Sequence, residues 1–334
     1  MNREHMQQAF IKHLQQKGRK PSTVERYSYD LNDFFSWLKD KPFTKMNHAD
    51  VEAFFYKLMA ARQYKTRTIR RVASVLRQFT VFIKDDYHCP HHPLLTYEAP
   101  SLELEPLVRE EWLSQDEVKK LLWSTHSDHD LSENQLLARP QLTERNYAIV
   151  LLLSYYGLTL QELCQVTMNQ LNLMQRTIDI ENGPFSRTLY IDEATSTQIH
   201  AYLMLIPEPV RPRFHSLDPL FVAYDFTRRT YHWSYDRDAP KALTEIALQK
   251  VIRTEVARAG LRKGISAQHF RHTFILRLLL SDKEIGTIQQ ETGLRSVLSF
   301  RRYALTVTQL TDKQKQALFY PTEVKEEVLH ETND

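Results

Sequence analysis

The stretch RNYAIVLLLSYYGLTLQEL, which runs from Arg145 to Leu163, carries the strongest fold signal in this 334-residue chain. Its first part, Arg145 to Tyr156, is mostly apolar and predicts a buried helix that Gly157 closes. The apolar run from Ala148 to Leu153 is far too short to cross a bilayer. We therefore expect this helix to form the centre of a globular domain, and we expect no membrane partner.

The segments around this helix predict an α-rich domain with a small sheet. Before it, Ser114 and Glu117 have the spacing of a capping box, and the polar stretch from His126 to Gln141 predicts a surface loop. After it, the β-prone runs 177–180 and 188–191 flank Asn182-Gly183 and predict a hairpin. Helices are expected to resume near Thr195, Thr244, His269 and Lys283.

The N-terminal part predicts a separate all-α domain over residues 1–85. Four helices are expected, at about 2–17, 22–39, 49–60 and 66–84. The fourth has an apolar stripe at helical spacing, made of Ile69, Val72, Leu76, Phe79 and Ile83. Its other faces carry the basic residues Lys65, Arg67, Arg70, Arg71 and Arg77. A charge run is usually a solvated face, so the composition of this helix alone does not establish a partner.

Residues 86–107 predict a linker, because they hold four prolines and show no helical period. Residues 108–320 form the second expected domain, and residues 321–334 an acidic flexible tail. The linker contains His88, Cys89, His91 and His92, which are metal-ligand types at a spacing that matches no familiar zinc pattern. We therefore expect no metal and no cofactor.

Composition limits the class of protein. Glycine is scarce, with 7 residues, which favours a mostly helical chain over a turn-rich β protein. Two cysteines imply no disulfide framework and fit a cytoplasmic protein. A net charge of +3 does not by itself indicate nucleic acid, so the distribution of the charge matters more.

Four landmarks in order give the chain a resemblance to tyrosine recombinases and phage integrases, from about Gln7 to Leu310. They are the Arg145–Leu163 stretch, the hairpin that ends Arg187-Thr188-Leu189-Tyr190-Ile191, the segment Gln268-His269-Phe270-Arg271-His272-Thr273-Phe274, and Gly293 followed ten residues later by Tyr303. The resemblance implies a mostly α fold with a small β-sheet. It also implies a two-domain DNA clamp, with an all-α core-binding domain and an α+β catalytic-like domain.

The chemistry of that family requires a tyrosine that attacks a DNA phosphate, two arginines that hold the phosphate oxygens, a hairpin lysine, and two further residues, usually histidines or a tryptophan. At the matching positions this chain keeps only Arg271 and Tyr303. The other four positions hold Thr159, Phe185, Gln268 and Leu294. His269 and Arg295 lie one residue away from the required positions, on the wrong side of the chain to replace them.

The lost residues predict a sequence-specific double-stranded DNA-binding protein without recombinase activity, acting as a transcriptional repressor of a phage or mobile element. Arg271 and Tyr303 would then be vestigial. The alternatives are a divergent, active site-specific tyrosine recombinase and a partner that modulates one. The candidate DNA-binding residues are Lys65, Arg67, Arg70, Arg71, Arg187, Arg271, Arg301 and Arg302. Self-association on DNA, and an effector of protein or peptide type, are left open.

Overall fold

The computed structural model describes residues 3–86, 89–181, 183, 186–294 and 296–319. The chain divides into two compact units, Met1–Glu103 and Leu104–Asp334. Both are mostly helical, and the sheets of the described residues are small, which confirms the predicted fold class. None of the helices in this described part combines the length and the apolar content needed to span a bilayer. The acidic tail predicted for 321–334 lies outside the described residues.

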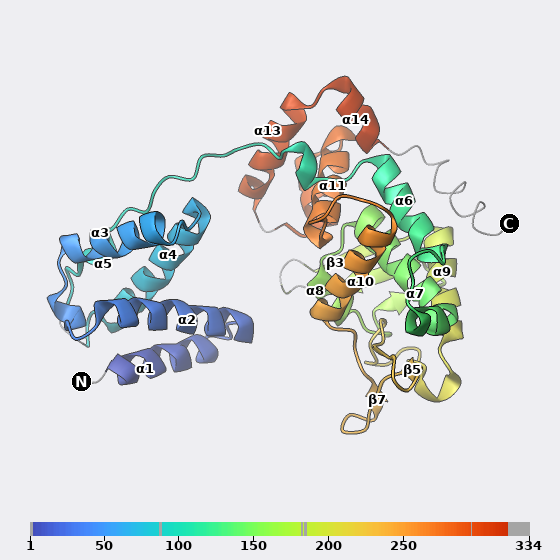
Figure 1. Cartoon of the computed structure of the whole chain (residues 1–334), viewed down its shortest axis with the longest axis horizontal. Coiled ribbons are helices and arrows are strands. Elements are labelled where there is room, and N and C mark those ends of the chain that lie inside the picture. Colours follow the sequence, from blue (N-terminus) through green and yellow to red (C-terminus); the bar gives the residue numbers. More distant parts are fainter. Residues whose placement is uncertain (1–2, 87–88, 182, 184–185, 295, 320–334) are drawn as a thin grey trace. The chain divides into compact units, whose positions relative to one another are not determined.

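The first unit is a helical bundle (Figure 1). Its α-helices are α1 (Arg3–Gln16), α2 (Pro21–Leu38), α3 (His48–Tyr56), α4 (Thr66–Ile83) and α5 (Pro93–Thr96). A 3-10 turn, Phe43–Lys45, precedes α3, and a π-helical turn, Lys57–Ala61, follows it. The whole predicted stripe of α4, from Ile69 to Ile83, is buried, because its apolar period faces the other helices.

Part of the segment expected to be a linker is folded into this unit. His92 is buried, stacks on Phe43 with ring centroids 4.1 Å apart, and caps α5 by accepting a hydrogen bond from the Leu94 amide. The basic side chains Arg70 and Arg77 donate to the carbonyl oxygens of Pro100 and Tyr97. Burial of an aromatic pair and satisfied backbone groups therefore hold this proline-rich segment against α4.

The second unit surrounds a long central helix, α7 (Glu133–Tyr156), which packs against α6 (Gln115–His126), α9 (Glu193–Leu205) and α11 (Ala267–Leu280). The sequence predicted a surface loop from His126 to Gln141, but α7 already begins at Glu133. The loop prediction is therefore wrong for Glu133–Gln141. Ser132 and Gln135 form a capping box there, and Ala138 is buried in the core, which stabilises the helix despite Pro140.

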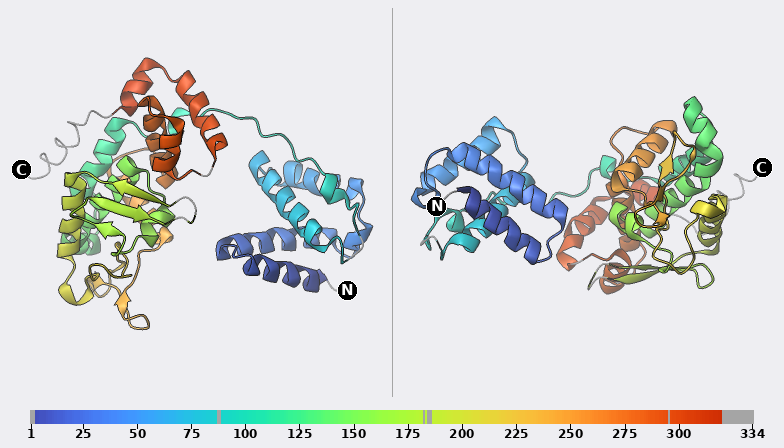
Figure 2. Two further views of the ribbon diagram at one scale, coloured as in Figure 1. Left: turned by 180° about the vertical axis from the view of Figure 1, so that it is seen from behind. Right: turned by 90° about the horizontal axis from the view of Figure 1, so that it is seen from below.

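The remaining elements of the second unit include a three-stranded antiparallel sheet of β1 (Leu171–Asn172), β2 (Thr177–Ile180) and β3 (Arg187–Tyr190). In the predicted hairpin, Ile178 pairs with Leu189 and Ile180 with Arg187. Two short hairpins follow, β4 (Tyr224–Asp225) with β5 (Thr230–Tyr231) and β6 (Trp233–Ser234) with β7 (Ala239–Pro240). The other helices are α8 (Leu160–Gln165), α10 (Glu245–Arg258), α12 (Ile285–Thr292), α13 (Arg301–Gln309) and α14 (Asp312–Leu318). Figure 2 shows α13 and α14, in red, at the opposite end of the unit from the orange hairpins.

Candidate active site

Arg271 is the residue around which the candidate site is built. It lies on α11 and is 7% exposed. One end of its guanidinium donates to the carbonyl oxygen of Gly157, which caps α7, and the other to that of Thr292, the last residue of α12. Both carbonyls lie at helix C-termini, where the partial negative charge favours a cation. Arg271 thus ties two helix ends to α11 while its charge stays in a buried site.

Tyr303 lies near the start of α13 and is 8% exposed. Burial raises the pKa of its phenol above the usual value, and the nearby charges of Arg271 and Arg302 partly oppose this effect. The phenol is therefore neutral at pH 7 and must lose its proton to act as a nucleophile. Its ring meets His272 edge to face, with centroids 5.6 Å apart.

His272 lies between Tyr303 and Gln268, the residue that stands where the family usually has a histidine. Its Nδ1 lies 2.8 Å from the carbonyl oxygen of Glu111, and its Nε2 lies 2.8 Å from the side-chain nitrogen of Gln268. These partners assign the neutral tautomer in which Nδ1 donates and Nε2 accepts. Burial lowers the pKa of His272, which favours this neutral form. Gln268 is therefore hydrogen-bonded to His272, whose ring packs against the ring of Tyr303.

Thr159, at the place of the family's first arginine, is a helix cap. Its backbone and hydroxyl both donate to Glu162 Oε2, at 2.8 and 2.9 Å, and so begin α8 with a capping box. The other oxygen of the Glu162 carboxylate accepts from Arg187 Nη1 at 2.5 Å. Burial raises the pKa of Glu162, but Arg187 and the Thr159 amide outweigh it and hold that pKa below the usual value.

Arg187 reaches this cluster from the start of β3. Its side chain is 5% exposed, and it interacts electrostatically with Arg271, as do Glu162 and Tyr303. Two of its nitrogens, Nε and Nη2, are buried and have no hydrogen-bond partner within the described residues. Two guanidinium groups, one carboxylate and a neutral phenol therefore form one buried cluster with net positive charge.

The structure brings together only some of the residues predicted from sequence. Arg187, Arg271 and Tyr303 share the site, whereas Arg302 is held by Glu111 at 2.7 Å and by the carbonyl of Glu105 at 3.0 Å. Arg301 is exposed, and Leu294 is half-buried against the apolar cluster that contains Tyr303. Phe185 and Arg295 lie outside the described residues.

The candidate residues of the first unit differ in exposure. Lys65, Arg67 and Arg70 are exposed on α4, and Arg70 bonds to a backbone carbonyl. Arg71 is half-buried and forms an ion pair with Asp30, which is 5% exposed. Arg71 therefore balances a buried carboxylate, which the sequence pattern did not indicate.

Two functional candidates, Glu162 and His272, were missed at the level of sequence. The spacing of Thr159 and Glu162 is that of a capping box and could have placed Glu162 at the start of α8. No local signal connects Glu162 to Arg187, because 25 residues separate them. Among the described residues no group of three or more His, Cys, Asp or Glu side chains could hold a metal.

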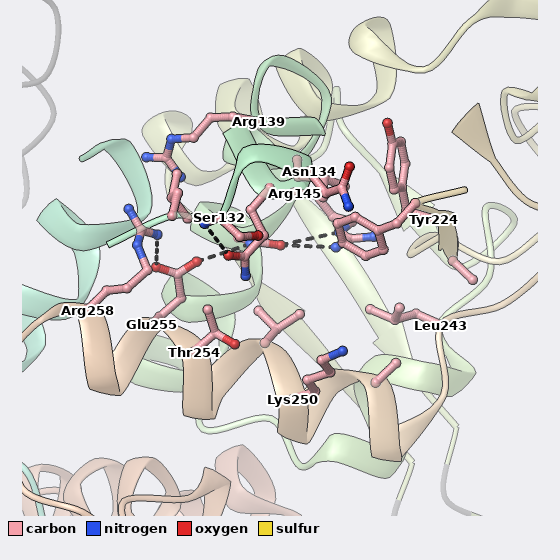
Figure 3. A pocket seen from close by; sticks show the side chains of 18 residues that line it. Ser132, Asn134, Arg139, Arg145, Tyr224, Leu243, Lys250, Thr254, Glu255 and Arg258 are labelled. Carbon is pink, nitrogen blue, oxygen red and sulfur yellow. Dashed lines mark hydrogen bonds and ion pairs between the residues drawn. The ribbon is translucent and has the colours of Figure 1, made fainter. Parts of the chain in front are cut away.

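A hollow elsewhere in the same unit lies between the start of α7, the β4 hairpin and α10, and has a volume of about 450 Å³ (Figure 3). The buried Arg145 lines it and donates to the carbonyl of Val222 at 3.1 Å. Glu255 and Arg258 form a buried ion pair at 2.7 Å in its wall. Arg145 is thus a structural member of the stretch that decides the fold, and the hollow includes neither Arg271 nor Tyr303.

Comparison with known proteins identifies the chain. Residues 8–86 match the phage integrase N-terminal SAM-like domain, and residues 111–309 match the phage integrase family. A tyrosine recombinase XerD of Oceanobacillus iheyensis is 24% identical over 304 residues, which cover 89% of this chain and 92% of the relative. A tyrosine recombinase XerC of Caldanaerobacter subterraneus is 25% identical, covering 86% and 78%. A lambda integrase dimer bound to a COC′ core site superposes with a TM-score of 0.63 at 14% identity, covering 93% of this chain and 98% of that one.

These relatives overturn the prediction of a DNA-binding repressor without recombinase activity. Relatives that match along most of their length are recombinases, so the expected pseudo-recombinase and the regulatory role are wrong, and the alternative of a divergent recombinase is better supported. The prediction counted side chains only at the family's catalytic positions and assigned Arg187 to DNA binding alone, whereas the fold brings Arg187 from β3 into interaction with Arg271 on α11. With family models that match both units, the chain belongs to the phage integrase family.

Proposed function

We propose that this protein is a site-specific recombinase of double-stranded DNA in which Tyr303 is the nucleophile. The observation that carries the proposal is the placement of the Tyr303 phenol in a buried, positively charged site, in electrostatic contact with Arg271. The recombinase relatives, and the DNA named with the lambda integrase structure, support the same activity. Because strand exchange needs a cleavage on each of two duplexes, more than one copy of the chain would act together.

The proposed step conserves atoms and protons. The phenol oxygen of Tyr303 attacks phosphorus, a phosphotyrosyl bond forms, the bond between phosphorus and the 5′ oxygen breaks, and that oxygen takes up one proton as the phenol releases one. His272 packs edge to face against the Tyr303 ring, and because Glu111 and Gln268 occupy both of its ring nitrogens it holds the phenol in place, while water carries the proton. Arg271 would face the charge that develops on the non-bridging oxygens, in a site where burial strengthens the interaction.

The DNA contacts follow from exposure. Lys65, Arg67 and Arg70 on α4, and Arg301 on α13, have accessible charges for phosphate contacts. Arg187 and Arg271, which interact electrostatically inside the protein, would contact the phosphate at which cleavage occurs. Arg71 and Arg302 are engaged in ion pairs with Asp30 and Glu111, so we expect them to support these surfaces from within the protein.

The test is covalent trapping. Duplexes bound by the full chain are selected from fragmented genomic DNA of the source organism, and nicked versions are incubated with protein and resolved on a denaturing gel. We expect a protein–DNA adduct that Tyr303→Phe abolishes while leaving DNA affinity within about tenfold, because only one hydroxyl is removed. Tyr235→Phe is the matched control, since Tyr235 is 83% exposed in the same unit. Specific binding without any adduct would contradict the proposal.

A further inference from the structure

Arg187 is a buried cation with unused hydrogen-bonding capacity. Only its Nη1 has a hydrogen bond within the described residues, to Glu162, whereas Nε and Nη2 are buried and unpaired. Buried charged donors without acceptors are costly, so each such group in a folded protein calls for an explanation. The neighbouring Arg271 uses two of its nitrogens on the backbone, so its situation differs from that of Arg187.

The backbone around Arg187 fixes where its guanidinium lies. Arg187 begins β3, where it pairs with Ile180, and Glu162 at the start of α8 holds Nη1. Gly293, in the left-handed conformation at φ 63° after α12, lies so close that a Cβ there would be 2.7 Å from Nη1. A side chain at position 293 would therefore displace the guanidinium, so the glycine leaves room for it.

The charges of the cluster favour an added anion. Arg187 and Arg271 repel each other, and Glu162 balances only one of them. The Glu162 carboxylate already accepts from Thr159 with its other oxygen, so it has little capacity left for Arg187. An oxyanion with two adjacent oxygens matches the Nε and Nη2 edge of a guanidinium, which is the geometry of bidentate arginine recognition.

We propose that Arg187 binds a phosphodiester oxyanion together with Arg271, and so supplies from β3 the second guanidinium that Thr159 cannot provide. Its part in cleavage rests on the proposed recombinase function, whereas its binding of an oxyanion does not. Nε and Nη2 are shielded from solvent, so phosphate binding requires local movement of the chain around Arg187.

The first experiment changes both partners of the proposed contact, Arg187 in the protein and the phosphate in the DNA. The substrate is the selected duplex with the cleaved position mapped, carrying there either the normal phosphate or an uncharged methylphosphonate. We expect Arg187→Gln to slow adduct formation on the phosphate by about 10²–10³-fold, as for the loss of a preorganised donor, and to be within about tenfold of the wild type on the methylphosphonate. An arginine that neutralises the phosphate is dispensable when that charge is absent.

Controls separate this role from a structural one. Arg176→Gln removes an exposed arginine paired with Glu193 next to the same sheet, and we expect normal rates on both substrates. If Arg187→Gln is equally slow on both substrates, Arg187 acts only through folding and the inference is overturned. If Arg187→Gln does not fold, Arg187→Lys replaces it. The lysine can retain the contact with Glu162 but lacks the planar guanidinium. Arg187→Lys should therefore form the adduct at least about tenfold more slowly than the wild type on the phosphate, and at the wild-type rate on the methylphosphonate.

A second experiment does not depend on cleavage. Melting temperatures of the full-length protein are compared in inorganic phosphate and in chloride at equal ionic strength. Phosphate should raise the melting temperature of the wild type and of Arg176→Gln by about 2–4 °C, and that of Arg187→Gln by much less. Equal shifts in all three proteins would overturn the oxyanion site. If only Arg187→Gln loses the phosphate-induced rise in melting temperature, and the wild type forms no adduct with DNA, the oxyanion site is supported and the recombinase proposal is rejected.

Discussion

Gly157 ends α7 directly against the ring of Phe274 on α11. A Cβ atom at position 157 would lie 2.6 Å from Cγ of that ring, and the backbone there has a φ of 59°. The same residue presents its carbonyl oxygen to Arg271. One glycine therefore sets both the close approach of α7 to α11 and a backbone contact of the buried arginine.

Replacement of Gly157 by alanine should destabilise the second unit by about 2–4 kcal/mol, since it adds overpacking to the strain of a left-handed alanine. Gly260→Ala is the matched control, because Gly260 has a similar φ of 63° and nothing within 4 Å of its added Cβ. The control should lose only about 1–2 kcal/mol. Chemical denaturation measures both values, and equal losses would show that Phe274 moves aside without cost.

Replacement of Arg71 by alanine should destabilise the first unit by about 1.5–3 kcal/mol, because it removes a charged hydrogen bond to the buried Asp30. Burial already raises the pKa of Asp30, and Arg71 is the main group that opposes this effect. A carboxylate with a raised folded pKa binds more protons in the folded than in the unfolded state. Stability therefore falls as pH rises from about 4 through the folded pKa.

Without Arg71 the pKa of Asp30 rises further, so the loss should be larger at pH 7 than at pH 4. Urea denaturation of both proteins at the two pH values measures the difference. Arg77→Ala serves as the control, since Arg77 is exposed on the same helix and, among the residues that the structure describes, its hydrogen bond goes to the carbonyl oxygen of Tyr97. A loss that does not depend on pH would mean that Asp30 is not the group that Arg71 balances.

Acidification should destabilise the second unit through His272. Burial lowers its folded pKa below 6.5, so the unfolded chain binds more protons in the range below pH 6.5. Stability is complete above that pH and is lost as pH falls toward the folded value, by at most ~1.4 kcal/mol per pH unit for one histidine. The half-buried His269, whose pKa is also lowered by burial, contributes with the same sign.

The variant Gln268→Glu tests this assignment, because a carboxylate next to His272 Nε2 would raise the pKa of the imidazole. Thermal denaturation between pH 5 and 7.5 should then show a weaker loss of stability in acid than in the wild type. An unchanged pH profile would indicate that His272 does not titrate in this range.

The spacing of apolar residues in the sequence was sufficient to predict the helices that bury one regular face. The stripe from Ile69 to Ile83 predicted α4 to within one residue, since its apolar spacing alone determines which face is buried. The start of α7 was missed because Glu133–Gln141 is polar and contains Pro140, and only the packing of Ala138 in the core shows that it is helical.

The candidate site depended still more on tertiary structure. Arg271 and Tyr303 were found by spacing, but the contact between Glu162 and Arg187 joins two elements that no periodicity relates. Likewise, the basic run on α4 did not reveal that Arg71 faces Asp30, which lies 41 residues earlier. Position-by-position comparison therefore underestimated how many cations lie in the buried cluster around Arg271.

DNA binding should depend on salt in proportion to the exposed charges of α4. Lys65 and Arg67 are exposed, and neither side chain forms a hydrogen bond or ion pair within the described part of the chain. If each neutralises one phosphate, Arg67→Ala should reduce the slope of log affinity against log salt by ~0.9, because one counterion fewer is released. Its effect on stability should stay within about 0.5 kcal/mol, since the side chain is outside the core.

Lys12→Ala is the control, an exposed cation on α1 that is expected to leave the slope unchanged. Fluorescence anisotropy with a selected duplex at several salt concentrations measures the slopes. If Arg67→Ala kept the full slope, α4 would face away from the DNA, and the contacts of the first unit would have to lie on another helix.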